Sequence, residues 1–257
     1  MSLGTIFLSE TMGTAMLILL GVGVVANVNM KGAGKGGGFL MVNWGWGLAV
    51  FSGVLVAFKS GGHLNPAVTL GMITAGHKCF VGAAPDCAGG VAVNFGSTMT
   101  YFGGELIGAF LGACLAYLAY KKQFDDPEIP GASKQVFATG PAISSPVWNV
   151  VTEAIGTFVL VFVILLAGLQ SSAGNLGWLN AFGVALLIVG IGASLGGPTG
   201  YAINPARDLM PRLAHFLLPI QGKGSSNWGY AWIPVVGPLI GGAIAGFAGN
   251  AVVSAWS

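Results

Sequence analysis

The segment GHLNPAVT (residues 62–69) contains an Asn-Pro-Ala triplet that returns in GYAINPARD (residues 200–208), and this pair organises the whole chain. Proline at the first position of a helix is preorganised for helical geometry, and a preceding asparagine can cap that helix while its amide still carries a donor. A single Asn-Pro is ordinary turn punctuation. Two copies in similar surroundings instead predict two short helices that begin at Pro66 and Pro205.

The two triplets lie in halves of the chain that repeat one another. Glu10-x-x-Gly13-Thr14 recurs as Glu153-x-x-Gly156-Thr157, and Leu-Ile-Gly at 106–108 recurs at 239–241, in the same order around the triplets. Each half holds three long apolar runs, so the second copy must enter the membrane from the opposite side, as in inverted repeats. The six runs cover approximately 5–27, 39–58, 96–119, 148–169, 178–196 and 230–253.

The composition excludes a soluble domain and a nucleic-acid partner. Of 257 residues, 54% are hydrophobic and 7% charged, and the mean hydropathy is +0.79. About 20 apolar residues cross a bilayer as a helix, while a formal net charge of +2 offers no basic surface for nucleic acid. The predicted fold class is an all-α, multi-pass membrane protein with six transmembrane helices and two re-entrant half-helices.

The predicted organisation has three parts. Residues 1–120 form the first inverted repeat with a half-helix over 66–76, residues 121–146 a polar connecting loop, and residues 147–257 the second repeat with a half-helix over 205–216. The loop at 78–94 is interpreted as a gate, a partner site or, preferably, an ordinary insertion. Three cysteines are too few and too scattered for a disulfide framework, and no metal or cofactor site is expected.

Two half-helices entering from opposite faces would bring their positive N-terminal ends together at mid-membrane. Asn65 and Asn204 would present two donors there, and the combination disfavours cations and protons while it orients small polar molecules. Arg207 stands three residues after Asn204 in an otherwise apolar segment, where a charge is costly and by default functional. Its fixed fork of donors can bind two hydroxyl groups; the alternative is a side chain that extends to the lipid headgroups.

These motifs resemble the aquaporin (major intrinsic protein) family over nearly the whole chain. The resemblance rests on the two Asn-Pro-Ala motifs (Asn65, Pro66, Ala67, Asn204, Pro205, Ala206), their flanking residues and the Glu-x-x-Gly-Thr repeats. Asp208, directly after Arg207, is a feature in which the sequence resembles the glycerol-conducting branch, the aquaglyceroporins. This branch includes the bacterial glycerol uptake facilitators.

The resemblance implies an outer selectivity constriction made of Trp44, Gly192, Tyr201 and Arg207. Water-selective relatives commonly carry His at the Gly192 position, so a wider pore is expected here. Trp44 and Tyr201 would form an aromatic corner for the carbon backbone of a polyol. Alternatively, Trp44 is an interfacial anchor. Tyr201 replaces the Phe of some glycerol facilitators, and its hydroxyl is expected to change the preference among glycerol, water, dihydroxyacetone and lactic acid.

The stretches before each triplet match the family's ladder of backbone carbonyls. These residues are Gly61, Gly62, His63, Leu64, Gly200, Tyr201, Ala202 and Ile203. Glu10 and Glu153 would support the ladder by accepting hydrogen bonds from loop amides; the alternative for such a pair is proton relay. Glu105, where relatives often have Gln, has no assigned role.

The expected function is a passive channel, not an enzyme, for glycerol and related small neutral solutes with some water, excluding ions and protons. One alternative is a channel that conducts mainly water or lactic acid. A less favoured alternative is an ion-coupled secondary transporter. The resemblance further implies a homotetramer in the lipid bilayer of a bacterial plasma (inner) membrane.

Overall fold

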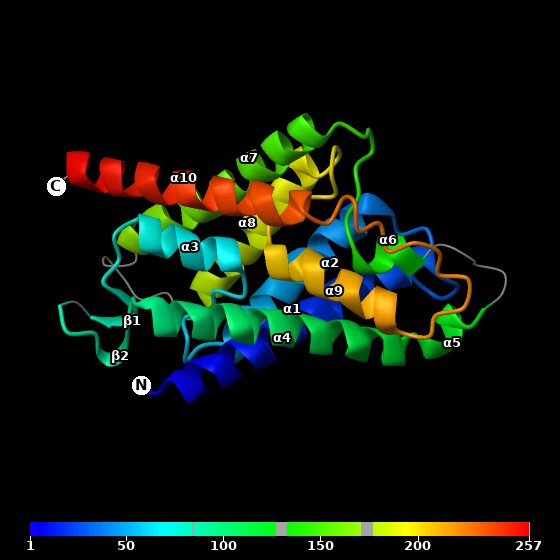
Figure 1. The fold of residues 1–257 in the computed structure, drawn as a ribbon, viewed down its shortest axis with the longest axis horizontal. Coiled ribbons are helices and arrows are strands. Elements are labelled where there is room, and N and C mark those ends of the chain that lie inside the picture. Colours follow the sequence, from blue (N-terminus) through cyan, green and yellow to red (C-terminus); the bar gives the residue numbers. More distant parts are fainter. Residues whose placement is uncertain (84, 127–132, 171–176, 257) are drawn as a thin grey trace.

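The computed structural model describes residues 1–83, 85–126, 133–170 and 177–256, and within these ranges it is a bundle of six long helices (Figure 1). They are α1 (Leu3–Asn29), α2 (Gly38–Val56), α4 (Phe95–Ala119), α7 (Pro146–Gln170), α8 (Leu179–Leu195) and α10 (Ile233–Trp256). Five are long and apolar enough to cross a bilayer, whereas α8 has 17 residues. The predicted apolar runs match all six, and the last is displaced by three residues because turns occupy the chain before Ile233.

Two short helices follow the Asn-Pro-Ala triplets, as the sequence predicts. They are α3 (Pro66–Thr74) and α9 (Pro205–Leu217), and each begins at a proline with an asparagine as its N-cap. The first is two residues shorter than predicted, since the chain turns at Gly76, where φ is +78°. The second ends one residue later than predicted.

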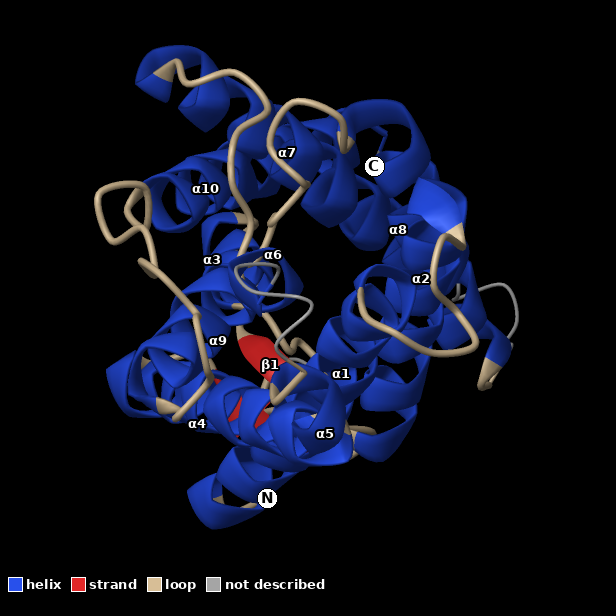
Figure 2. Ribbon diagram, turned by 90° about the vertical axis from the view of Figure 1, so that its right-hand side faces the viewer, coloured by secondary structure: helices blue, strands red, loops and turns tan. Residues whose placement is uncertain are grey.

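Small residues let the long helices pack closely within each half. Helix α1 lies against α4, and α7 against α10, while α2 and α8 join the two halves. A Cβ atom on Gly104 would lie 2.9 Å from the carbonyl oxygen of Phe7, and one on Gly237 would lie 2.7 Å from the Cβ of Glu153. The glycines therefore stand where neighbouring helices touch. In the end-on view of Figure 2, α3 and α9 lie between α10 and α4. Helix α3 contacts α10, and helix α9 contacts α4.

The two ends of the bundle carry different connections. Both chain termini lie at one end, together with a hairpin of β1 (Cys79–Ala83) and β2 (Ala88–Ala92), as Figure 1 shows. The short helices α5 (Lys121–Phe124) and α6 (Ser133–Phe137) lie at the other end. Part of the predicted connecting loop, residues 127–132, falls outside the described residues.

The hairpin corrects the expectation for the cysteines. Cys79 and Cys87 form a disulfide, with their Cα atoms 5.5 Å apart. Their spacing of eight residues gives no sign of a bond in the sequence, but the strands fold back antiparallel and bring the two positions together. Cys114, within α4, is a free cysteine.

Candidate functional site

The two Asn-Pro-Ala asparagines meet at the centre of the bundle and bind across it. The Nδ2 atom of Asn65 donates to the carbonyl oxygen of Ile203 at 2.8 Å, and Nδ2 of Asn204 donates to the carbonyl oxygen of Leu64 at the same distance. Each side-chain oxygen caps its own short helix. The N-termini of α3 and α9 thus face each other, and each amide nitrogen keeps a second hydrogen for a further acceptor.

The residues before each triplet form two irregular loops. The first NPA loop is residues 57–65 and the second NPA loop is residues 196–204. Several positions adopt the left-handed backbone conformation, which is unfavourable for residues other than glycine. These positions are Gly61, Gly62 and Leu64 in the first loop, and Gly200, Tyr201 and Ile203 in the second.

A buried glutamate holds the amides of each NPA loop. Glu10, in α1, accepts hydrogen bonds from the backbone N–H of His63 at 3.0 Å and of Leu64 at 2.7 Å. Glu153, in α7, accepts from the N–H of Ala202 at 3.0 Å and of Ile203 at 2.8 Å. The same two-bond pattern therefore occurs in both halves.

These bonds fix the direction of the loop carbonyls. In a trans peptide the C=O points opposite to the N–H that follows it. Because the amides of His63 and Leu64 face Glu10, the carbonyls of Gly62 and His63 point away from it. The Ala202 and Ile203 amides orient the carbonyls before them in the same way. The arrangement orients these acceptors while the four amides that follow them are paired with the glutamates.

A cavity of about 820 Å³, counting the part open to solvent, runs along these loops. One side is apolar and comes mainly from α2, α7 and α8: Val50, Val54, Leu160, Ile164, Val184 and Ile188. Polar groups reach the cavity from the loops and short helices: His63, Asn65, Tyr201, Asn204 and Arg207. A path with one apolar and one hydrogen-bonding side suits solutes that have both kinds of surface.

Arg207 presents unused hydrogen-bonding capacity to this cavity. The residue is 8% exposed, and its Nη1 has no hydrogen-bond partner among the described residues. The guanidinium carbon lies 3.9 Å from the ring centroid of Trp46, a cation–π contact. The hydroxyl of Tyr201 is likewise buried and without a partner in this part of the chain. Buried polar atoms left unpaired are costly, so this site is suited to a ligand that supplies acceptors and donors.

The structure corrects the predicted position of the aromatic wall. Trp44 is 44% exposed and does not line the cavity, whereas Trp46 is 4% exposed and does. Two residues apart on a helix point about 200° from one another, so only one of the pair can face inward. The exposed position of Trp44 fits the alternative interpretation as an anchor.

Gly192 has a different consequence from the one predicted. A Cβ atom there would lie 2.5 Å from Oδ1 of Asn43 and 2.7 Å from Cζ of Tyr201. The room left by the missing side chain is therefore occupied by the phenol of Tyr201 and by Asn43. Gly192 admits the tyrosine ring, and neither Gly192 nor Gly200 lines the cavity itself.

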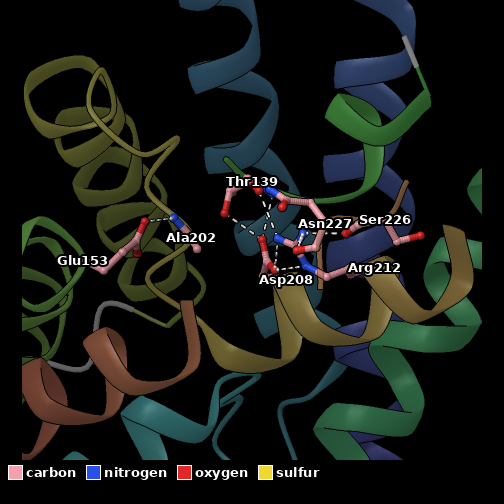
Figure 3. A network of polar contacts seen from close by, with 7 residues as sticks. All are labelled: Thr139, Glu153, Ala202, Asp208, Arg212, Ser226 and Asn227. Carbon is pink, nitrogen blue, oxygen red and sulfur yellow. Dashed lines mark hydrogen bonds and ion pairs between the residues drawn. The ribbon is translucent and has the colours of Figure 1, made fainter. Parts of the chain in front are cut away.

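A buried ion pair fixes the start of α9, which carries Arg207 (Figure 3). Arg212 donates to Oδ1 of Asp208 from Nε at 2.9 Å and from Nη2 at 2.7 Å, and both side chains are almost fully buried. The remaining donors of Arg212 reach the carbonyl oxygens of Thr139, Ser226 and Asn227. Two bonds to one carboxylate oxygen, with every donor of Arg212 used, make a rigid connection.

The other oxygen of Asp208 binds the chain before the second repeat. Oδ2 accepts from the backbone N–H of Thr139 at 2.7 Å and from its hydroxyl at 2.6 Å. Thr139 also lies 3.5 Å from the Cβ position of Gly200, on the second NPA loop. Sequence reasoning missed Arg212 and Thr139; the spacing of four residues between two opposite charges in an apolar segment was the available signal for Arg212.

Glu105 lies behind the first NPA loop and does not line the cavity. Its Oε1 accepts a hydrogen bond from the Thr69 hydroxyl at 2.8 Å, and Thr69 in turn contacts Nδ1 of His63 at 2.8 Å. Because the hydroxyl has a single hydrogen, His63 must donate from Nδ1. The His63 ring also stacks on Tyr101, with ring centroids 4.3 Å apart.

A model of the major intrinsic protein family matches residues 2–248. The chain belongs to this family. Among curated members, it is 45% identical over 240 residues to a probable glycerol uptake facilitator protein of Thermotoga maritima, covering 93% of this chain and 95% of the relative. It is 46% identical over 249 residues to the glycerol uptake facilitator protein of Bacillus subtilis, covering 96% and 84%.

A solved member of the family has the same fold. The aquaglyceroporin from Plasmodium falciparum superimposes with a TM-score of 0.83 at 30% sequence identity, covering 99% of this chain and 98% of that one. Family membership and the apolar helices make the chain an integral, multi-pass membrane protein.

Proposed function

We propose that the chain is a passive channel that conducts glycerol and related small neutral polyols, with some water, across the plasma membrane. The observation that carries this proposal is the pairing of unpartnered polar atoms, on Arg207 and Tyr201, with the apolar wall of the same cavity. A polyol presents hydroxyl groups along one edge and carbon along the other. It can bind the polar atoms while its carbon chain contacts Trp46 and the valines of α2.

The similarity to proteins named for glycerol uptake supports the same substrate class. The relatives in Thermotoga maritima and Bacillus subtilis carry that name and share nearly half of their residues with this chain. We therefore extend glycerol from the relatives to this chain as the substrate.

We further propose that ions and protons are excluded. The facing N-termini of α3 and α9 and the guanidinium of Arg207 place positive potential along the path. Each central asparagine donates one amide hydrogen to the opposite loop and keeps the second for a passing solute. Proton transfer along a file of water molecules needs all of them to point the same way. Two fixed donors at the centre oppose that common orientation.

The ion-coupled transporter is the weaker alternative. Coupling needs an intramembrane acid that exchanges an ion, and Glu10 and Glu153 each accept two loop amides. Both carboxyl groups thus have a supporting role in the loops. We propose that they hold the carbonyl ladder rather than relay protons.

The test is light scattering by proteoliposomes under a sorbitol gradient and then a glycerol gradient, with and without a proton gradient. We expect rapid shrinkage followed by rapid glycerol re-swelling, with a low activation energy and no response to the proton gradient. Shrinkage without accelerated glycerol entry would instead indicate a water channel. Glycerol movement that follows the proton gradient would support the transporter.

A further inference from the structure

The hairpin of β1 and β2 packs directly on the first NPA loop. The ring of Phe80 lies edge-on to His63, with centroids 5.4 Å apart, and 4.8 Å from the ring of Tyr101. A Cβ atom on Gly61 would lie 3.3 Å from the Val81 side chain. Gly61 and His63 both line the cavity, so β1 supports the back of two lining residues.

The hairpin is also connected to the buried support of that loop. Phe80 and Val91 form a small apolar cluster with Ile6 of α1 and Tyr101 of α4. The hydroxyl of Tyr101 donates to the carbonyl oxygen of Ser60 at 2.5 Å. Ser60 in turn donates to the glutamate that holds the loop amides. A continuous set of contacts therefore leads from the hairpin to the amides of the first NPA loop.

The two strands are short and irregularly paired, and the disulfide links them. Each strand has five residues, and their pairing contains two irregularities. An isolated two-stranded hairpin of this kind is marginal in water. The bond between Cys79 and Cys87 closes the strands at the point where β1 leaves the end of α3.

The two cysteines are buried just beneath exposed residues of the hairpin. Each cysteine is 8% exposed, and the neighbouring residues Asp86, Ala88 and Gly89 are exposed. Cys87 has φ of +55°, a left-handed conformation that is unfavourable for a residue with a side chain. Opening the bond frees this residue to relax, which favours reduction, and strained disulfides are the labile class.

We propose that Cys79 and Cys87 form a site of reversible thiol–disulfide exchange that controls the order of the first NPA loop and hence permeation. The reductant is a dithiol. Its thiolate attacks one cysteine sulfur, the second thiolate releases the mixed disulfide, and two electrons and two protons pass to the cysteine pair as the dithiol becomes a disulfide. The oxidised hairpin keeps Phe80 and Val81 against the loop, and the reduced hairpin releases them.

The effect on permeation rests on the channel function proposed above, so the experiment has two readouts. Purified protein in proteoliposomes is treated with dithiothreitol or left oxidised, and glycerol re-swelling is measured by light scattering. Hydrogen exchange of the peptide covering residues 57–65 is measured on the same samples by mass spectrometry. We expect reduction to lower glycerol permeability by about threefold or more and to speed exchange of the loop amides.

Two variants serve as controls. Cys114→Ala keeps the hairpin disulfide and must still respond to dithiothreitol, since Cys114 lies in α4 away from the pair. The double variant Cys79→Ser/Cys87→Ser must behave like the reduced protein and ignore dithiothreitol. Reduction of the unaltered, folded protein provides the test even when the double variant does not fold.

The outcomes separate this inference from the proposed function. Equal glycerol permeability and equal loop exchange in the two redox states would overturn the exchange site and leave the channel intact. Faster loop exchange on reduction, in a protein that passes no glycerol in either state, would uphold the exchange site and refute the glycerol channel.

Discussion

At the scale of single residues, Arg207 is the strongest determinant of the proposed selectivity. Its charge is buried beside Trp46, one of its donor nitrogens has no partner in the described chain, and the residue lines the cavity. Replacing it by alanine removes both the positive potential and the donors. We expect Arg207→Ala to raise proton conductance by roughly tenfold, which corresponds to about 1.4 kcal/mol of lost barrier. The measurement is the decay of a pH gradient in proteoliposomes, and an unaltered decay rate would contradict the assignment.

Tyr201 is predicted to adjust the preference among small solutes. Its hydroxyl is buried without a partner in the described chain, beside the site of Arg207. Tyr201→Phe removes this polar atom and keeps the ring. We expect the ratio of glycerol to water permeability to fall by about two- to fivefold, because the polyol loses a hydrogen-bonding partner that the proposed site supplies. Unchanged ratios for glycerol, dihydroxyacetone and lactic acid would remove the hydroxyl from the selectivity argument.

Gly192 offers a steric test of the same constriction. A methyl group there collides with Asn43 and with the Tyr201 ring, so that ring must shift. Overpacking costs about 1–3 kcal/mol, and we expect Gly192→Ala to lower glycerol permeability by roughly tenfold, and water permeability by less. Gly183→Ala is the matched control, since it lies on the same helix with open space around it. Equal losses in both variants would mean that the site of substitution is irrelevant.

At the scale of elements, the pair of Asp208 and Arg212 positions α9 against the chain before the second repeat. Asp208→Asn leaves the guanidinium of Arg212 buried with a weakened partner. Breaking a buried pair from one side costs about 3–5 kcal/mol, so we expect a clearly lower unfolding temperature in detergent. Lys121→Gln, at a pair exposed to solvent, is the control and should change the unfolding temperature little. A similar unfolding temperature for the two variants would show that the buried network does not hold α9.

The sequence predicts where these elements begin far better than which way they face. Pro66 and Pro205 mark the starts of α3 and α9 because proline and asparagine have strong local preferences at those positions. The inner face of α2 cannot be predicted in the same way. Apart from Asn43 and Ser52 its residues are apolar or glycine, and two polar residues are too few to form a stripe that distinguishes Trp46 from Trp44.

The remaining misses involve partners that are distant along the chain. Thr139 reaches Asp208, and Asn43 reaches Gly192, only through the packing of separate helices. The bond between Cys79 and Cys87 depends on the hairpin in the same way. By contrast, the repeat predicts equivalent positions for Glu10 and Glu153, and the family resemblance implies that both support the loops, as the hydrogen bonds show.

At the scale of the whole molecule, the outer surface is suited to lipid and to other copies of the chain. Large apolar side chains are exposed on several long helices, among them Leu8, Leu48, Leu118, Ile155 and Phe247. We predict a homotetramer with one pore in each subunit. Native mass spectrometry of the protein in detergent should give four copies of the 26.0-kDa chain. A monomer that is stable and active after reconstitution would contradict this assembly.

The crossed asparagine bonds have a consequence for how the protein is made. The Asn65 amide and the Leu64 carbonyl find their partners only in residues of the second half. During synthesis the first three membrane helices and α3 are therefore made before Ile203 and Asn204. Until then the Asn65 amide and the Leu64 carbonyl lack these partners. The second repeat must be synthesised before the first can form its central hydrogen bonds, so neither repeat reaches its native structure alone.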